Sequence, residues 1–181
     1  MSLNETIKIH NEKFPFQGDL AARNVLLTHD LKAKIADFGL STRIYSYASV
    51  RKGKNDQIIP FRWAAIEVLR GEPAIKEYSD VWSFGVLMWE IFYLGFTVPY
   101  GDKKEVEEVV SFLQEGNRLN KPPLCPLDTY DLMLNCWNED YIMRPIFLHL
   151  KEQLKKSESK NYPIPNFNVE SREKFTYLQM T

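Results

Sequence analysis

Two short stretches near the start of the chain, Val25-Leu26-Leu27 and Ala33-Lys34-Ile35, flank a polar turn. Strand-forming residues on either side of a turn predict a small β-hairpin. Asp19 and Asn24 precede the first stretch, and Asp37 follows the second. Because the outer ends of the two strands of a hairpin lie side by side, we expect these three side chains to gather at one end. Their carboxylate and amide oxygens are ligands of the kind that magnesium prefers.

The remainder of the sequence is mainly helical in its hydrophobic periodicity. We expect helices over residues 3–14, 66–69, 79–94, 105–115, 127–137 and 146–156. Ser79 is the predicted N-cap of the third helix and Asp80 lies in its first turn, since both residue types favour a helix N-terminus. This helix is apolar on nearly all sides apart from Glu90, so it should be buried. The most apolar stretch, residues 81–96, is interrupted by Glu90 and is too short and too acidic at that point to span a bilayer.

Composition and charge exclude several classes of protein. The chain is 44% hydrophobic and 26% charged with a formal net charge of −1, which favours an ordinary globular domain over a nucleic-acid-binding protein. The spacing of Cys125 and Cys136 fits no zinc pattern, and two thiols make a poor disulfide framework. A reduced, intracellular (cytoplasmic) setting is therefore expected. The first ten residues lack the apolar region of a signal peptide, and we expect no transmembrane segment in this chain.

We expect one domain over residues 1–156 and a flexible tail over residues 157–181, where the sequence becomes polar and loses its periodicity. Within the domain, residues 40–60 are polar and have no clear period. That is long for a structureless loop in a compact domain, and such loops are usually functional or disordered.

Six motifs follow one another along the chain: Asp19-Leu20-Ala21-Ala22-Arg23-Asn24, Asp37-Phe38-Gly39, Pro60-Phe61-Arg62-Trp63, Ala65-Ile66-Glu67, Ser79-Asp80-Val81-Trp82-Ser83-Phe84-Gly85-Val86, and Cys136-Trp137 with Met143-Arg144-Pro145. In this order and spacing they resemble the C-terminal lobe of a protein tyrosine kinase over residues 19–154. Ala21 stands where serine/threonine kinases place a lysine, and Arg23 gives the tyrosine-kinase form of the loop. The resemblance implies a mainly α-helical, protein-kinase-like C-terminal lobe with a small β-hairpin.

The resemblance also implies catalytic roles. Asp19 would accept or orient the proton of the substrate hydroxyl, and Arg23 would hold that hydroxyl or Asp19 in place. Asn24, itself part of the catalytic loop, and Asp37 would bind Mg²⁺ and, through it, the cofactor ATP. Pro60 and Trp63 would belong to a substrate-facing loop within the activation segment, residues 37–67.

Other matched residues would have structural roles. Glu67 and Arg144 would form a buried ion pair, and Asp80 would accept hydrogen bonds from amides of the catalytic loop. Phe38 and Gly39 complete the tripeptide that begins with Asp37.

The sequence departs from the family pattern before Asp19. Gln17 and Gly18 stand where the family has histidine and arginine. Gly18 has no side chain to bind a phosphorylated activation loop, so control by phosphate there should be weak or absent. Gln17 should be a poor replacement in the apolar stack behind Phe38.

A second departure is the absence of the segments that grip the nucleotide. Only 18 residues precede Asp19, and the sequence has neither a glycine-rich Gly-x-Gly-x-x-Gly loop nor a Val-Ala-Ile-Lys strand. We therefore expect the N-terminal lobe to be missing and the chain alone to be inactive and unable to bind ATP. Apolar surface around Trp82, Val86 and Trp89 should then be incompletely covered.

Three tyrosines are candidate phosphorylation sites. Tyr45 and Tyr47 lie in the activation segment, with an unregulated loop tyrosine as the alternative. Tyr177 opens a Tyr-x-x-Met sequence that resembles a docking motif for an SH2 domain. The other partners implied by the resemblance are protein tyrosine substrates.

Three hypotheses follow. In the first, the chain is a C-lobe segment of a tyrosine kinase, whose parent could be a membrane-anchored receptor. In the second, it is a non-catalytic, pseudokinase-like scaffold that binds protein partners. In the third, it is a fragment, from truncation or gene prediction, without an independent role.

Overall fold

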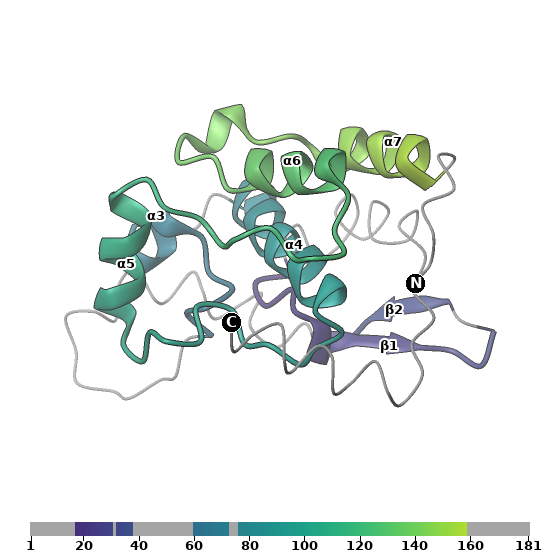
Figure 1. The fold of residues 1–181 in the computed structure, drawn as a ribbon, viewed down its shortest axis with the longest axis horizontal. Coiled ribbons are helices and arrows are strands. Elements are labelled where there is room, and N and C mark those ends of the chain that lie inside the picture. Colours follow the sequence, from purple (N-terminus) through teal and green to yellow (C-terminus); the bar gives the residue numbers. More distant parts are fainter. Residues whose placement is uncertain (1–16, 31, 38–59, 73–75, 159–181) are drawn as a thin grey trace.

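The computed structural model describes residues 17–30, 32–37, 60–72 and 76–158, which are mainly helical (Figure 1). In chain order the elements are the 3₁₀ helix η1 (Ala22–Asn24), strands β1 (Val25–Leu27) and β2 (Ala33–Ile35), helices α3 (Ile66–Leu69), α4 (Lys76–Phe92), α5 (Val106–Gln114) and α6 (Leu127–Cys136), the 3₁₀ helix η2 (Tyr141–Met143), and α7 (Phe147–Glu158). The predicted fold class, mainly α with one small hairpin, is confirmed. The helix predicted over residues 3–14 lies outside the described residues.

The predicted hairpin is confirmed in both of its strands. β1 and β2 are antiparallel, with Val25 opposite Ile35 and Leu27 opposite Ala33. The backbone N–H of Thr28 donates to the carbonyl of Lys32 at 2.9 Å and closes the turn. The outer ends of the two strands therefore lie together, as the sequence pattern requires.

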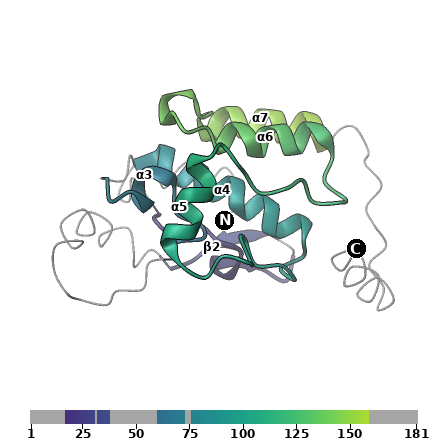
Figure 2. The same cartoon turned by 60° about the vertical axis from the view of Figure 1, so that its left-hand side comes forward.

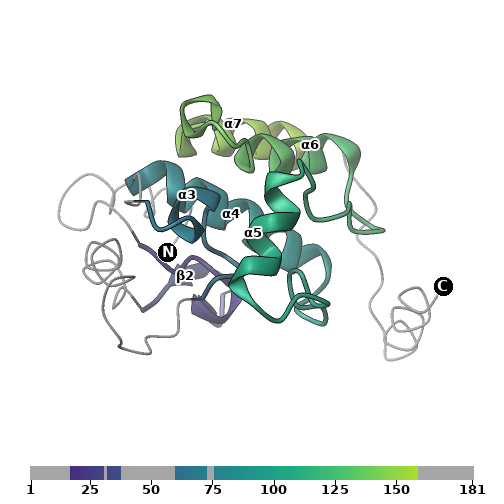
Figure 3. The ribbon, with the colours of Figure 1, turned by 90° about the vertical axis from the view of Figure 1, so that its left-hand side faces the viewer.

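Helix α4 occupies the centre of the fold. The hairpin and η1 lie on one side of it, and the α6–α7 pair lies on the other (Figures 1 and 2). Helices α3 and α5 pack together beside α4, as the view in Figure 3 also shows. Because α4 contacts η1 and α6, it connects the segment before the hairpin to the late helices.

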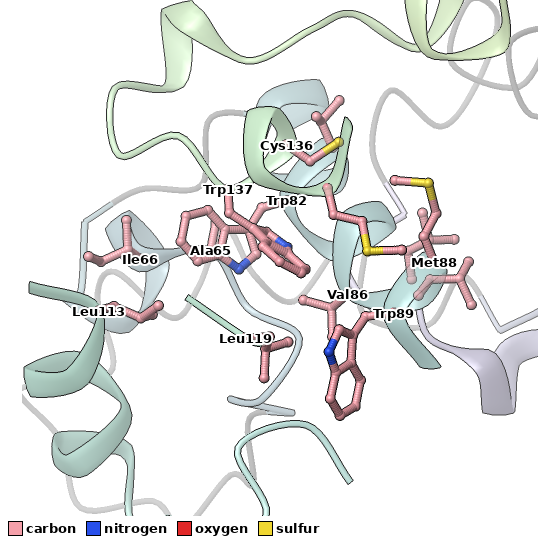
Figure 4. Packing of buried hydrophobic residues seen from close by; sticks show 14 of the residues in the cluster. Ala65, Ile66, Trp82, Val86, Met88, Trp89, Leu113, Leu119, Cys136 and Trp137 are labelled. Carbon is pink, nitrogen blue, oxygen red and sulfur yellow. The ribbon is translucent and has the colours of Figure 1, made fainter. Parts of the chain in front are cut away.

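The core is centred on two tryptophans, Trp82 of α4 and Trp137 at the end of α6 (Figure 4). Trp82 and Val86 are 0% exposed and Trp89 is 4% exposed, so the expectation of incompletely covered surface around them was wrong. Arg118 covers part of the Trp82 ring, with its guanidinium carbon 5.5 Å from the ring centroid. The indole N–H of Trp89 donates to the carbonyl of Asn120 at 2.8 Å. Residues that follow α5 thus cover surface that the sequence pattern left without a partner.

The start of α4 differs from the prediction. The helix begins at Lys76, so Ser79 is an interior residue and not the N-cap. Ser79 and Asp80 use their side chains to bond other segments: the Ser79 hydroxyl donates to Glu67, and the Asp80 carboxylate accepts from the amides of Gln17 and Gly18. A capping residue type cannot be distinguished from a tertiary hydrogen-bonding residue in sequence alone, because both use the same polar atoms.

The later helices lie close to their predicted positions. At the start of α5, the Glu108 carboxylate accepts from the backbone N–H groups of Lys104 and Glu105 at 2.7 and 2.9 Å. Helix α7 continues through Glu158, two residues beyond its predicted end. Ser157 is buried and its hydroxyl lies 3.3 Å from that of Thr129 on α6, which explains the extension. Within the described ranges, every helix is too short or too polar to cross a lipid bilayer.

Candidate active site

The segment before η1 is anchored to the centre of the fold by Asp80. Its two carboxylate oxygens accept hydrogen bonds from the backbone N–H groups of Gln17 and Gly18, at 2.7 and 2.9 Å. Asp80 is 1% exposed, so these bonds form away from water. Hydrogen bonds to a charged carboxylate are stronger than those between neutral groups. The position of the loop that carries Asp19 is therefore set by α4.

Asp19 is held from two sides by residues of η1. The side-chain amide nitrogen of Asn24 donates to the Asp19 carbonyl and to its Oδ2, both at 2.8 Å. Arg23 forms an ion pair with the other carboxylate oxygen, Oδ1. These two bonds fix the orientation of the Asn24 side-chain amide. Its nitrogen faces Asp19, so its oxygen lies on the other branch of the planar group.

Asp37 follows β2 and lies at the same end of the hairpin. The backbone N–H of Ala36 donates to the carbonyl of Asn24 at 2.8 Å, which joins the two outer ends. Asp37 itself adopts a left-handed backbone conformation, with φ of 55°. The structure thus brings Asp19, Asn24 and Asp37 together, as the hairpin pattern led us to expect.

The pKa of the Asp19 carboxyl reflects this crowding. Burial raises the pKa of the Asp19 carboxyl above its ordinary value, the Arg23 charge and the Asn24 hydrogen bond oppose that rise, and the negative charge of Asp37 adds to it. A negative charge that disfavours the ionisation of the neighbouring Asp19 carboxyl is an arrangement that a cation stabilises.

The donor chemistry at this end of the hairpin fits magnesium. Across the described residues there is no group of three or more His, Cys, Asp or Glu placed to bind a metal ion. Mg²⁺ commonly uses one or two protein carboxylates and completes its coordination with water and substrate phosphates. The Asp37 carboxylate and the oriented amide oxygen of Asn24 are hard oxygen donors that would hold the ion in that manner.

The predicted substrate loop joins the same site through a residue that the motif analysis missed. Glu90 of α4 is buried, and its Oε2 accepts from the backbone N–H of Ala22 at 2.9 Å and from the indole N–H of Trp63 at 2.8 Å. The Trp63 ring in turn carries the Arg23 guanidinium, whose carbon lies 4.3 Å from the ring centroid. The acidic residue within the apolar run of residues 81–96 was the signal that could have pointed to Glu90. Pro60 begins the turn that presents Trp63, and its carbonyl accepts from the Trp63 N–H at 3.0 Å.

The expected ion pair is formed by Glu67, in the first turn of α3. Arg144 donates to Oε1 and Oε2 of Glu67 at 2.9 and 2.8 Å. The Ser79 hydroxyl adds a third hydrogen bond to Glu67, at 2.7 Å. These contacts join the segment that carries Trp63 to α4 and to the residues before α7. The predicted residues Phe38, Gly39, Tyr45, Tyr47 and Tyr177 lie outside the described part of the chain.

Comparison with known proteins shows the family of the chain. A sequence model of the family described as protein tyrosine and serine/threonine kinase matches residues 9–154. The chain is 43% identical over 147 residues to the tyrosine-protein kinase receptor TYRO3 of Danio rerio, covering 81% of this chain and 16% of that protein. It is 44% identical over 136 residues to the Gallus gallus TYRO3 receptor, covering 75% of this chain and 15% of that protein.

A fibroblast growth factor receptor of Halocynthia roretzi is 46% identical over 136 residues, with 75% of this chain and 17% of the receptor covered. The chain thus spans about a sixth of the length of the curated relatives it matches. The mainly helical fold with one hairpin is that of the kinase C-terminal lobe. The chain therefore belongs to the protein kinase family, as a segment of a tyrosine-kinase catalytic domain.

Proposed function

We propose that this segment supplies the catalytic loop and magnesium-binding residues of an enzyme that transfers the γ-phosphoryl group of ATP to protein tyrosine. The observation that carries the proposal is the pairing of Asp19 with both Arg23 and Asn24, beside Asp37. In phosphoryl transfer the protein contributes mainly positioning and electrostatic stabilisation, and these contacts supply both.

Asp19 orients the tyrosine hydroxyl and accepts its proton as the oxygen attacks phosphorus. Arg23 limits the positions that the Asp19 carboxylate can take, and Trp63 limits those of Arg23. Asn24 and Asp37 would hold Mg²⁺, which when bound neutralises charge on the phosphates of ATP. Trp63 and Pro60 would belong to the loop that holds an acceptor tyrosine next to Asp19.

The relatives' names lead to further parts of the proposal. The parent protein is a membrane-anchored receptor with this segment on its intracellular side, as the receptor kinases among the relatives suggest.

Tyr177, once phosphorylated, is a docking site for an SH2 domain. A phosphopeptide covering Tyr177 that recovers no SH2 protein in a pull-down contradicts this last part alone.

Activity is tested by joining the 181-residue chain to the N-terminal lobe of a receptor tyrosine kinase and measuring phosphotyrosine formation on a tyrosine-containing peptide. Asp19→Asn should lower the rate by about 10²- to 10⁴-fold, because the proton acceptor is lost. Asp131→Asn, at an exposed position on α6, is the matched control and should leave the rate unchanged. A folded, ATP-binding fusion without activity would favour the scaffold hypothesis over the enzyme.

A further inference from the structure

Gln17, immediately before the catalytic loop, bonds both halves of the site with one side chain. It is 4% exposed. Its Oε1 accepts from the backbone N–H of Asp19 at 2.6 Å, and its Nε2 donates to the Asp37 carbonyl at 2.9 Å. A longer contact of 3.4 Å joins the same nitrogen to the Ala36 carbonyl. Neither the composition of the chain nor its motif spacing predicted these contacts.

The backbone of Gln17 is fixed independently of its side chain. Its N–H donates to Asp80 of α4 at 2.7 Å. A side chain attached to a fixed backbone and bonded at both ends of its amide has little freedom left. Gln17 thus relates the position of Asp37 to that of α4 and Asp19, although Asp37 lies 20 residues away in the chain.

The backbone of Asp37 is strained. Its φ of 55° is in the left-handed region, which costs a non-glycine residue about 1–2 kcal/mol. Its side chain is exposed, so burial does not hold it. A hydrogen bond to its carbonyl from a buried amide stabilises this conformation and with it the direction of the carboxylate.

We propose that Gln17 is a positioning residue that sets the separation between Asp19 and Asp37 and thereby the affinity of the metal site. This inference rests on the proposed function, since it concerns the same two carboxylates. The amide of Gln17 has a donor and an acceptor, and the structure uses both. The expectation about the apolar stack behind Phe38 stays a prediction, because Phe38 lies outside the described residues.

The inference is tested on the full 181-residue chain with Mn²⁺ as the probe. Binding of Mn²⁺ is measured by the broadening of the assigned NMR signals of Asn24 and Asp37. Gln17→Met has a side chain of similar length without the amide. It should weaken Mn²⁺ binding about 10-fold or more, as loss of residues that orient metal ligands typically does. It should also speed hydrogen exchange at the Asp19 amide, which loses its acceptor. Gln17→Asn keeps an amide that is too short to reach both partners, so it should shift both measurements in the same direction if Gln17→Met does not fold.

A control separates positioning from general loss of stability. Val109→Ala removes buried volume from α5, whose Val109 is 0% exposed, so it should destabilise the fold without altering Mn²⁺ affinity. Unchanged Mn²⁺ affinity in Gln17→Met would overturn the inference, even with faster exchange at Asp19, because Gln17 would then be only structural. A wild-type chain with no saturable Mn²⁺ broadening would instead overturn the proposed metal site, and this inference with it.

Discussion

The guanidinium of Arg144 and the carboxylate of Glu67 meet through two hydrogen bonds of 2.9 and 2.8 Å, although the residues are 77 positions apart in the chain. Their side chains are 0% and 6% exposed. The pair joins the end of the substrate segment to the residues that precede α7, so two parts of the fold share one electrostatic contact.

Breaking this pair should destabilise the protein strongly. In Glu67→Gln, the Arg144 charge stays buried without its counter-ion, which typically costs about 3–5 kcal/mol. Thermal unfolding followed by circular dichroism should show a fall in Tm of roughly 6–20 °C for a chain of this length. Glu152→Gln, on the exposed side of α7, is the control and should change Tm little. Equal melting temperatures for the two variants would exclude a stabilising pair.

The contribution of Glu67 should depend on pH. Burial raises the pKa of its carboxyl, but the hydrogen bonds and charge of Arg144 and the Ser79 hydroxyl outweigh burial, so the pKa lies below its ordinary value. The unfolded state therefore binds a proton more readily, and the stabilisation is present above the ordinary carboxyl range and lost as pH falls through the folded-state pKa. The difference in unfolding free energy between wild type and Glu67→Gln should narrow from about pH 7 to about pH 3. A difference that is constant over this range would contradict the assignment.

Gly85 should not accept a side chain. A Cβ at this position would lie 2.6 Å from Nε1 of Trp137 and 2.8 Å from the Cβ of Cys136. Alanine has a better helix propensity than glycine by about 1 kcal/mol, but the overlap between α4 and α6 should exceed this gain and give a net loss of about 1–3 kcal/mol. Urea denaturation of Gly85→Ala measures the balance, with Ser111→Ala on the exposed face of α5 as the control. A stabilised Gly85→Ala would show that α6 can move away without cost.

Gly18 is suited to its position by its backbone conformation, with φ of 82°. Gly18→Ala should lose about 1–2 kcal/mol of stability, because an L side chain is strained in the left-handed region. Gly116 has a similar φ of 85° and open space around its Cβ position, so Gly116→Ala measures the conformational cost alone. A Gly18→Ala variant as stable as wild type would mean that the loop adopts another conformation without penalty.

Trp63 should stabilise the fold through both its indole nitrogen and its ring. Trp63→Phe removes the hydrogen bond to Glu90 and keeps an aromatic face for Arg23, so it should cost about 1 kcal/mol. Trp63→Leu also removes the aromatic face and should cost about 0.5–1 kcal/mol more. Urea denaturation distinguishes the two variants. If both lose the same stability, the contact between Arg23 and the ring contributes nothing measurable.

Local pattern was sufficient for the elements whose residues interact with near neighbours in sequence. The hairpin formed where strand residues flank a turn, and α3 runs over the predicted residues 66–69. Both elements close over a few residues, so propensity and turn chemistry decide them. The hairpin pattern predicted that Asp19, Asn24 and Asp37 lie together, and the resemblance to the kinase family predicted the contact between Glu67 and Arg144.

The sequence by itself determined which polar residues this protein carries and the elements on which most of them lie. Only the tertiary structure decided what those residues bond to. Ser79 bonds Glu67 instead of capping a helix, Glu90 joins Ala22 to Trp63, and Gln17 connects Asp19 with Asp37. The physical reason is that a hydrogen-bonding group has the same chemistry with any partner, and the partner is set by segments far away in the chain that folding brings within 3 Å.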